Sequence, residues 1–279
     1  MTTCVVTTSL KADPVSVREA ADWAARLGAR VVRRRGRSIP SLCREEGVEG
    51  ALVLSTVRPP TFMPADGAVG YSYHPGMAIA RIRNVRQGLG DPMVTAMALQ
   101  AGDSVLDCTL GRASDALVAS FVVGPRGRVV GIESSPILAE LTIHGLQTYE
   151  PAGEGLTPVL RRIEAHRGDH LEYLSARPAD EFDVVCFDPL FEEPVEASSA
   201  MEPFRPLADA QPLSGEAVAE ARRVARRCVV IKERPDAALW ERLQVDRVVA
   251  GRTSSIAYGV IDVCRPTEEV SPWRPSEPS

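Results

Sequence analysis

The stretch Ser104-Val-Leu-Asp-Cys-Thr-Leu-Gly-Arg-Ala-Ser-Asp115 is the part of the sequence that decides the fold class. It starts with an apolar run typical of a buried strand, turns at Gly111 and enters a helical pattern near Ser114. Further strand-like runs occupy residues 128–132, 162–166, 182–187 and 228–232, and helix-like segments occupy residues 136–147, 170–174 and 216–226. Because parallel neighbours need crossover connections, this alternation predicts a mostly parallel sheet with helices on both faces.

The chain ends in a different pattern. A short helix near Leu239 precedes strand-like runs at residues 245–250 and 256–263, and the brief turn between these runs predicts an antiparallel hairpin. Dinucleotide dehydrogenases usually end with a further parallel strand. Five parallel strands closed by a hairpin instead resemble the Rossmann-like class I methyltransferases, so we expect an α/β fold of that type.

The first ninety residues carry a smaller strand and helix pattern of their own. Strand-like runs at 4–8, 29–33 and 51–56 alternate with helices that should begin at Asp13-Pro14 and at Ile39. We interpret the Pro- and Gly-rich stretch from Pro59 to Gly76 as a connector, followed by a helix over residues 77–87 with Arg81 on its polar side and by a helix that opens at Asp91-Pro92. These patterns predict a small basic α/β lobe (residues 1–75), a second, larger domain (76–265) and a disordered tail (266–279).

Composition excludes several classes of protein. The 279 residues are 44% apolar, which is enough for a sizeable core, and no apolar run approaches the roughly 20 residues that cross a bilayer. The six cysteines lie far apart, without a CxxC pair or a Cys/His cluster at zinc spacing. We therefore expect a soluble cytoplasmic protein with reduced, mostly buried cysteines, no bound metal and no membrane contact.

Charge is unevenly distributed along the chain. Residues 1–90 hold 13 Lys and Arg against 7 Asp and Glu, whereas the remainder holds 19 against 30. A basic appendage on an acidic body favours contact with a polyanion such as RNA, because Lys and Arg neutralise phosphates. The run Arg33-Arg-Arg-Gly-Arg37 fits that role, and it fits the solvated end of a strand equally well.

Polar residues follow each of the first three strands of the predicted parallel sheet. In such sheets ligands bind beyond the carboxyl ends of the strands, where the strand order reverses. Gly111 lets the backbone approach a ligand closely, and Glu133 can hold a ribose diol. Asp169 and His170 form a polar cluster that can accept from an adenine amino group. Either acid could instead cap the following helix, but their joint appearance in this order favours a nucleoside cofactor.

The fourth strand ends in Phe187-Asp188-Pro189-Leu190-Phe191. This has the layout of the acidic-or-amide, Pro, variable, aromatic motif that methyltransferases of exocyclic amines place beside the methyl donor. Hydrogen bonds from the amine to Asp188 would favour a pyramidal nitrogen with an available lone pair, and Phe191 could stack on the base. The alternative is a strand that ends at a proline beside an ordinary buried Phe.

Two further features lie near this end of the sheet. The stretch between Pro189 and Pro212 has little regular pattern, which is unusual in a compact domain unless the segment covers a site, so we expect a substrate lid. Lys232, one of only two lysines, follows the fifth strand. It could contact a phosphate or a base edge, or it could form a structural ion pair.

With these motifs in place, the chain from about Tyr73 to Val263 resembles a family of class I methyltransferases that use S-adenosylmethionine (SAM) and are related to the bacterial small-subunit ribosomal RNA guanine-N2 methyltransferase. The motifs that carry the resemblance are His74-Pro-Gly-Met-Ala-Ile-Ala-Arg81, Leu106-Asp-Cys-Thr-Leu-Gly-Arg-Ala-Ser-Asp115, Asp188-Pro-Leu-Phe191, Phe204-Arg-Pro-Leu207 and Val229-Val-Ile-Lys232. The resemblance implies that SAM is the cofactor and lies among Ser114, Asp115, Glu133, Ser134, Asp169, His170 and Asp188. Two departures bear on the substrate: the RNA enzymes usually carry Gly-Leu-Gly-Arg-Asp in the first loop, and Met at the position of Leu190.

The resulting hypothesis is a SAM-dependent methyltransferase of an exocyclic nucleobase amine, with guanine N2 of ribosomal RNA as the first choice. A small-molecule or protein amine is the alternative substrate, and a non-catalytic SAM- or RNA-binding module is the alternative class of protein. We predict catalytic roles for Asp188, Pro189 and Phe191, and substrate contacts for Phe191, Lys232 and Arg81. Cofactor contacts are predicted for Asp107, Thr109, Gly111, Ser114, Asp115, Glu133, Ser134, Asp169, His170 and Asp188.

Overall fold

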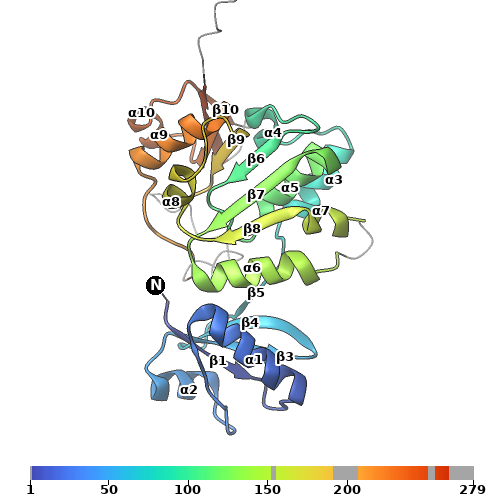
Figure 1. Cartoon of the computed structure of the whole chain (residues 1–279), viewed down its shortest axis with the longest axis vertical. Coiled ribbons are helices and arrows are strands. Elements are labelled where there is room, and N and C mark those ends of the chain that lie inside the picture. Colours follow the sequence, from blue (N-terminus) through green and yellow to red (C-terminus); the bar gives the residue numbers. More distant parts are fainter. Residues whose placement is uncertain (1, 152–154, 191–206, 251–254, 264–279) are drawn as a thin grey trace, which may run out of the picture.

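A seven-stranded sheet forms the centre of the larger part of the chain (Figure 1). The structure is a computed structural model that describes residues 2–151, 155–190, 207–250 and 255–263. The strands are β6 (Ser104–Asp107), β7 (Arg128–Glu133), β8 (Ile163–Arg167), β9 (Phe182–Phe187), β10 (Ala225–Glu233), β11 (Arg247–Ala250) and β12 (Ala257–Asp262). Their order is β11-β12-β10-β9-β6-β7-β8, with β6 to β10 parallel and β12 antiparallel to both β10 and β11. The predicted mostly parallel sheet with an antiparallel C-terminal hairpin is therefore confirmed.

Helices cover both faces of this sheet. They are α3 (Ala78–Arg86), α4 (Pro92–Met97), α5 (Ser114–Val123), η1 (Gly124–Arg126), α6 (Pro136–Thr148), α7 (Thr157–Arg161), α8 (His170–Ser175), α9 (Gly215–Val224) and α10 (Leu239–Arg242). Successive strand residues point to opposite faces: Val105 and Val184 join a core with α4 and α5, while Leu106 and Val185 join a second core with α8 and α9. Two apolar layers thus hold the carboxyl ends of the strands in fixed positions.

The N-terminal lobe has its own five-stranded sheet, in the order β2-β1-β3-β4-β5. Its strands are β1 (Cys4–Thr8), β2 (Arg30–Val31), β3 (Gly50–Ser55), β4 (Arg58–Pro64) and β5 (Tyr71–Ser72), and its helices are α1 (Pro14–Leu27) and α2 (Ile39–Glu46). Asp13 caps α1, at the predicted start, by accepting from the amides of Val15 and Ser16, and Gly28 ends the helix in the left-handed conformation. We propose that the boundary between the two domains lies near residue 75, between β5 and α3.

The expectation of a connector from Pro59 to Gly76 is wrong. Residues 58–64 form β4, which is antiparallel to β3 and contributes the fully buried Phe62 to the core. The two prolines, which lack an amide donor, lie where the β3–β4 register shifts, between the pairs Val53–Thr61 and Ser55–Arg58. The strand therefore tolerates them at an irregular point of the ladder, which the residue types alone could not show.

The lobe packs on the larger domain through α6, which lies between them in Figure 1. Trp23 of α1 is buried in a core that includes Leu138 of α6 and Leu207 of the segment before α9. Its ring meets His144 edge-on at 5.3 Å. Arg167, at the end of β8, donates to the backbone oxygen of Arg26 at 2.8 Å. The lobe thus contacts the larger domain at the carboxyl end of β8, on the edge of the sheet where the candidate site is expected.

Other sequence expectations concern single residues. The predicted helix at 216–226 is two residues too long, because Ala225 already pairs with Phe182 at the start of β10. Lys232 lies within β10 rather than after it, because the strand continues to Glu233. The five described cysteines are free, and four of them are buried. No helix in the described ranges is long and apolar enough to cross a membrane. Within those ranges, no cluster of three or more His, Cys, Asp or Glu side chains could hold a metal ion.

Candidate active site

The loop after β6 is clamped to its neighbours by backbone hydrogen bonds. Asp107 ends the strand in a buried position, and its Oδ1 accepts from the amide of Thr109 at 3.0 Å. Gly111 adopts a left-handed conformation, with φ of 54°, that favours glycine. Its amide donates to Glu133 Oε2 at 2.8 Å, and its carbonyl accepts from the Thr142 hydroxyl at 2.7 Å. The loop therefore has one defined shape at the carboxyl edge of the sheet.

Helix α5 begins at this loop without a side-chain cap. Its N-cap residue, Ala113, cannot accept a hydrogen bond through its side chain, and the Ser114 hydroxyl donates instead to the carbonyl of Pro75 at 2.9 Å. Helices α6, α8 and α9 begin at the same edge, and each is capped by the side chain before it, from Ser135, Asp169 and Ser214 respectively. The first turn of α5 is therefore suited to an anionic group, such as the carboxylate of an amino-acid ligand.

The acids after β7 and β8 make backbone hydrogen bonds. Glu133 is buried, and its two oxygens accept from the amides of Gly111 and Ser135, each at 2.8 Å. Burial raises the pKa of Glu133 above its ordinary value. Asp169 caps α8 by accepting from the amides of Leu171 and Glu172, so the capping alternative weighed from the sequence is present here. Their contacts with ribose and adenine stay predictions.

The neighbours of these two acids are also placed by the structure. Ser134 donates its hydroxyl to Asp209 Oδ2 at 2.9 Å. The His170 ring meets Phe187 edge-on at 5.6 Å, and burial lowers its pKa, so the neutral ring is favoured. A neutral imidazole beside the end of β9 is compatible with a flat, uncharged ligand group such as adenine.

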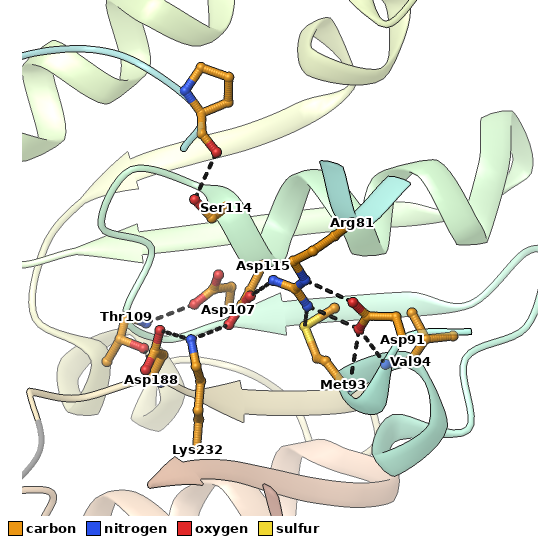
Figure 2. A network of polar contacts seen from close by, with 11 residues as sticks. Arg81, Asp91, Met93, Val94, Asp107, Thr109, Ser114, Asp115, Asp188 and Lys232 are labelled. Carbon is orange, nitrogen blue, oxygen red and sulfur yellow. Dashed lines mark hydrogen bonds and ion pairs between the residues drawn. The ribbon is translucent and has the colours of Figure 1, made fainter. Parts of the chain in front are cut away.

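A chain of alternating charges crosses the site from α4 to the end of β9 (Figure 2). Arg81 of α3 holds Asp91 through two hydrogen bonds, at 2.8 and 3.0 Å, and also pairs with Asp115 Oδ1. Lys232 Nζ lies 3.3 Å from Asp115 Oδ2 and 2.6 Å from Asp188 Oδ2. The amide of Asp188 donates to the Thr109 hydroxyl. Both the backbone and the carboxylate of Asp188 are therefore held by neighbouring residues.

Acidic groups outnumber basic groups around this chain. Burial, with the nearby charge of Asp115, raises the pKa of Asp107 to about 8. Burial would also raise the pKa of Asp115, but Lys232 and Arg81 lower it to about 2. For Asp188, burial and Asp115 raise the pKa while Lys232 opposes them. Because like charges disfavour further ionisation, this end of the sheet is suited to a ligand that brings a positive charge.

These groups border a small pocket where β6, β9 and β10 end. Its lining brings together the predicted residues Asp107, Asp115, Asp188 and Lys232 with Met97, Cys186, Phe187, Val230 and Tyr258. Pro189 and Leu190 follow Asp188 and are half-buried, whereas Phe191 and most of the lid expected between Pro189 and Pro212, residues 191–206, lie outside the described residues. The substrate contacts predicted for Arg81 and Lys232 stay predictions, and the structure pairs both side chains with carboxylates.

Besides the apolar and cysteine side chains that line the pocket, sequence reasoning missed two polar residues of this site. Tyr258 reaches the pocket because β12 pairs it with Lys232 across the hairpin junction, and no motif marks it. Asp91 was expected only as the start of α4, which it does cap, but it also binds Arg81. Its position ten residues after Arg81, beyond the end of the helix, is the one sequence signal that could have suggested the pair.

Comparison with known proteins identifies the family of the chain. A family described as "Putative SAM-dependent methyltransferase" matches residues 62–255, which include every residue of the charged chain. The chain belongs to this family. It is therefore a SAM-dependent methyltransferase, and SAM is its cofactor. The uncapped start of α5, the buried Glu133 and the excess of carboxylates fit the carboxylate, ribose and sulfonium groups of that cofactor.

Individual proteins and a solved structure are similar to the methyltransferase. An uncharacterized protein of Bacillus subtilis, YpiP, is 40% identical over 191 residues, which are 68% of this chain and 74% of that protein. The ribosomal RNA small subunit methyltransferase J of Laribacter hongkongensis is 31% identical over 61% of this chain, and the match spans 60% of its own length. A solved SAM-dependent methyltransferase from Neisseria gonorrhoeae superposes with a TM-score of 0.64 at 17% identity, over 96% of this chain and 99% of the other. That likeness shows that the fold is shared.

Proposed function

We propose that the methyltransferase acts on an exocyclic nucleobase amine of RNA, with guanine N2 of ribosomal RNA as the target. The observation that carries the proposal is the position of Asp188 at the end of β9, where its carboxylate borders a small acidic pocket and is fixed by Lys232. Three relatives that bear the name ribosomal RNA small subunit methyltransferase J support the choice of RNA. The motif Asp188-Pro-Leu-Phe191 supports the choice of an amine conjugated with a ring.

In this proposal Asp188 accepts a hydrogen bond from the target amine. The lone pair of an aromatic amine is delocalised into the ring, so an acceptor that draws one N–H out of the ring plane makes the nitrogen more nucleophilic. Pro189 fixes the chain direction after β9, and Phe191 stacks on the base that carries the amine. SAM, when bound, supplies an electrophilic methyl group. The residues contribute mainly orientation, together with stabilisation of the positive charge that develops on the nitrogen.

The cofactor contacts follow the carboxyl edge of the sheet. We assign the amino-acid end of SAM to Asp107, Thr109, Gly111 and the first turn of α5, at Ser114 and Asp115. Glu133 and Ser134 take the ribose, as expected of an acid after the second strand of such a sheet. Asp169 and His170 take the adenine. The uncapped start of α5 and the buried carboxylate of Glu133 support this assignment.

The basic lobe is our candidate for contact with the RNA backbone. Arg34 and Arg37 bind backbone carbonyls within their own turn, Arg34 Nη2 to the carbonyl of Arg37 at 2.8 Å and Arg37 Nη2 to that of Arg33 at 2.6 Å. The side chains of Arg33 and Arg35 are exposed. Arg33→Glu/Arg35→Glu should weaken RNA binding and flatten its dependence on salt by about one to two ions. An unchanged slope in a filter-binding titration would limit the lobe to a bracing role.

The central experiment is methylation of ribosomal RNA from cells that lack the gene. Purified protein is incubated with an extract of these cells and methyl-labelled SAM, the RNA is separated from proteins and small molecules, and the nucleosides of the digested RNA are analysed by mass spectrometry. The proposal expects labelled N2-methylguanosine with the native protein and none with Asp188→Ala. Label that appears only in a small molecule or a protein would favour the alternative substrates. Absence of label in every fraction, although SAM binds, would favour a non-catalytic module.

A further inference from the structure

We propose that Lys232 is a positioning residue, which keeps the Asp188 carboxylate turned toward the target amine and is itself anchored through Asp115 to Arg81 and Asp91. This inference rests on the proposed function, because it assigns Asp188 the contact with the amine. It gives Lys232 and Arg81 a role other than the predicted contacts with substrate. Figure 2 shows the five side chains in one unbroken chain of hydrogen bonds and ion pairs.

The surroundings of Lys232 favour a position inside the protein over contact with RNA. Its side chain is only 16% exposed, and its ammonium group lies between two carboxylates, at 2.6 Å from Asp188 and 3.3 Å from Asp115. An RNA phosphate would have to displace one of these partners in a nearly closed space. The pair Lys232–Tyr258 in the β10–β12 ladder holds the base of the side chain against the pocket wall.

The far end of the chain gives Lys232 a rigid anchor. Asp115 accepts from Arg81 on Oδ1 and from Lys232 on Oδ2, so both of its oxygens are engaged. Arg81 grips Asp91 with two nitrogens, and Asp91 Oδ1 also accepts from the amides of Met93 and Val94 at the start of α4. A planar guanidinium held by two carboxylates has little rotational freedom. The position of Lys232 is thus tied to helix α4.

The arrangement leaves part of Asp188 available to the substrate. Among the described residues, the hydrogen bonds to its carboxylate come from Lys232 and involve Oδ2 alone. The amide of Asp188 is fixed by Thr109, so the remaining freedom of the side chain is rotation about its Cα–Cβ and Cβ–Cγ bonds, which Lys232 restrains. Oδ1 can then accept an N–H from the amine. Lys232 is paired with two carboxylates, those of Asp115 and Asp188. Its positive charge therefore repels the positive charge that develops on the methylated nitrogen less than it would if Asp188 were its one partner.

Kinetics of four variants test the inference. With single turnovers on ribosomal RNA, Lys232→Met should lower the methyl-transfer rate by about 100-fold, as for loss of one preorganised polar group in a site. The RNA KM and the SAM Kd should change by less than about 3-fold. Lys232→Arg should recover part of the rate. In an Asp188→Asn background, Lys232→Met should have almost no further effect, because the group it positions is gone.

Other kinetic outcomes would overturn the inference. A raised RNA KM with an unchanged rate would place Lys232 in contact with substrate. Rate losses that multiply in the Asp188→Asn/Lys232→Met double variant would show that Lys232 acts independently of Asp188. Arg222→Met, at an exposed cation of α9 away from the pocket, is the matched control and should behave like the native protein.

A second measurement separates this inference from the proposed function. Aspartate labelled with carbon-13 at the carboxyl group reports each side chain by NMR, and Asp188→Asn identifies the signal of Asp188. Lys232→Met should move the titration of that signal to higher pH and broaden it, whereas Arg222→Met should not. An Asp188 signal that titrates identically in Lys232→Met and native protein would refute the positioning role, whether or not ribosomal RNA is methylated. Conversely, absence of RNA methylation with a shifted titration would refute only the proposed function.

Discussion

Replacement of Asp107 by Asn should change how the stability of the methyltransferase depends on pH. Asp107 is 3% exposed, and burial with the nearby Asp115 raises its pKa from 3.8 to about 8. The folded protein therefore retains a proton on Asp107 between about pH 4 and pH 8 that the unfolded chain releases. The stabilising effect of that proton is complete at low pH and is lost as the pH rises toward 8. In the native protein, Asp107 Oδ1 accepts from the Thr109 amide at 3.0 Å, and the side-chain oxygen of Asn can accept the same hydrogen bond. Asn does not ionise, so it has no proton to lose.

The magnitude follows from the shift in pKa. Each pH unit between the unfolded and folded pKa values removes roughly 1.4 kcal/mol of stability from the native protein, so the free energy of unfolding of Asp107→Asn relative to native should rise by about 4 kcal/mol from pH 5 to pH 8 and then level off. Urea unfolding followed by circular dichroism, at several pH values and with equal m-values in the two proteins, measures this difference. All other titrating groups contribute equally to the pH dependence of the two proteins, so their effects cancel in the difference. Parallel curves for the two proteins would show that Asp107 is ionised in the folded state and would refute the reasoning.

Three further substitutions test the site and its support. Asp188→Ala should abolish methylation while the SAM Kd measured by calorimetry changes by less than about 10-fold, because Asp188 is one of the ten predicted cofactor contacts and the other nine remain; loss of SAM binding would contradict this. Gly111→Ala should lower stability by about 1–3 kcal/mol and weaken SAM binding, since its φ is 54°, whereas Gly28→Ala, at a φ of 63° in the lobe, should lower stability alone. Trp23→Ala should lower the free energy of unfolding by about 3–5 kcal/mol, because it leaves a cavity in the core between the lobe and α6. The control Val57→Ala, at an 85% exposed site, should change the free energy of unfolding by less than about 0.5 kcal/mol.

The parts of the fold that sequence reasoning found are those with strong local signals. The apolar runs of β6, β7, β9 and β10 and the helix starts at Asp13, Asp91 and Ser114 could be placed to within a few residues, since their patterns depend on neighbours in the sequence. Strand β4 was missed because Pro59 and Pro60 normally interrupt a sheet, and only the partner strand β3 shows that they fall at a shift in register.

The candidate site was found residue by residue, but its internal contacts were not. Asp107, Asp115, Asp188 and Lys232 each follow or lie in a strand or helix whose end could be predicted, so their gathering at one edge follows from the parallel topology. Their pairing depends on side-chain directions: Arg81 and Asp115 are 34 residues apart, and Lys232 and Asp188 are 44 apart. An ion pair was therefore no more than an alternative for Lys232 until the structure placed its ammonium group between two acids.

The charge balance of the site connects the cofactor to the positioning chain. Arg81 and Lys232 provide two positive charges, whereas Asp91, Asp115 and Asp188 provide three negative charges, and Asp107 adds a fourth when it ionises. In the cofactor site that we propose, the sulfonium of SAM would supply the missing positive charge to the carboxylates around the pocket, and its demethylated product would not. A nearby cation favours the ionised form of an acid. The pocket carboxylates, which are costly to ionise in the free protein, would therefore bind the positively charged methyl donor more tightly than the uncharged sulfur of the product.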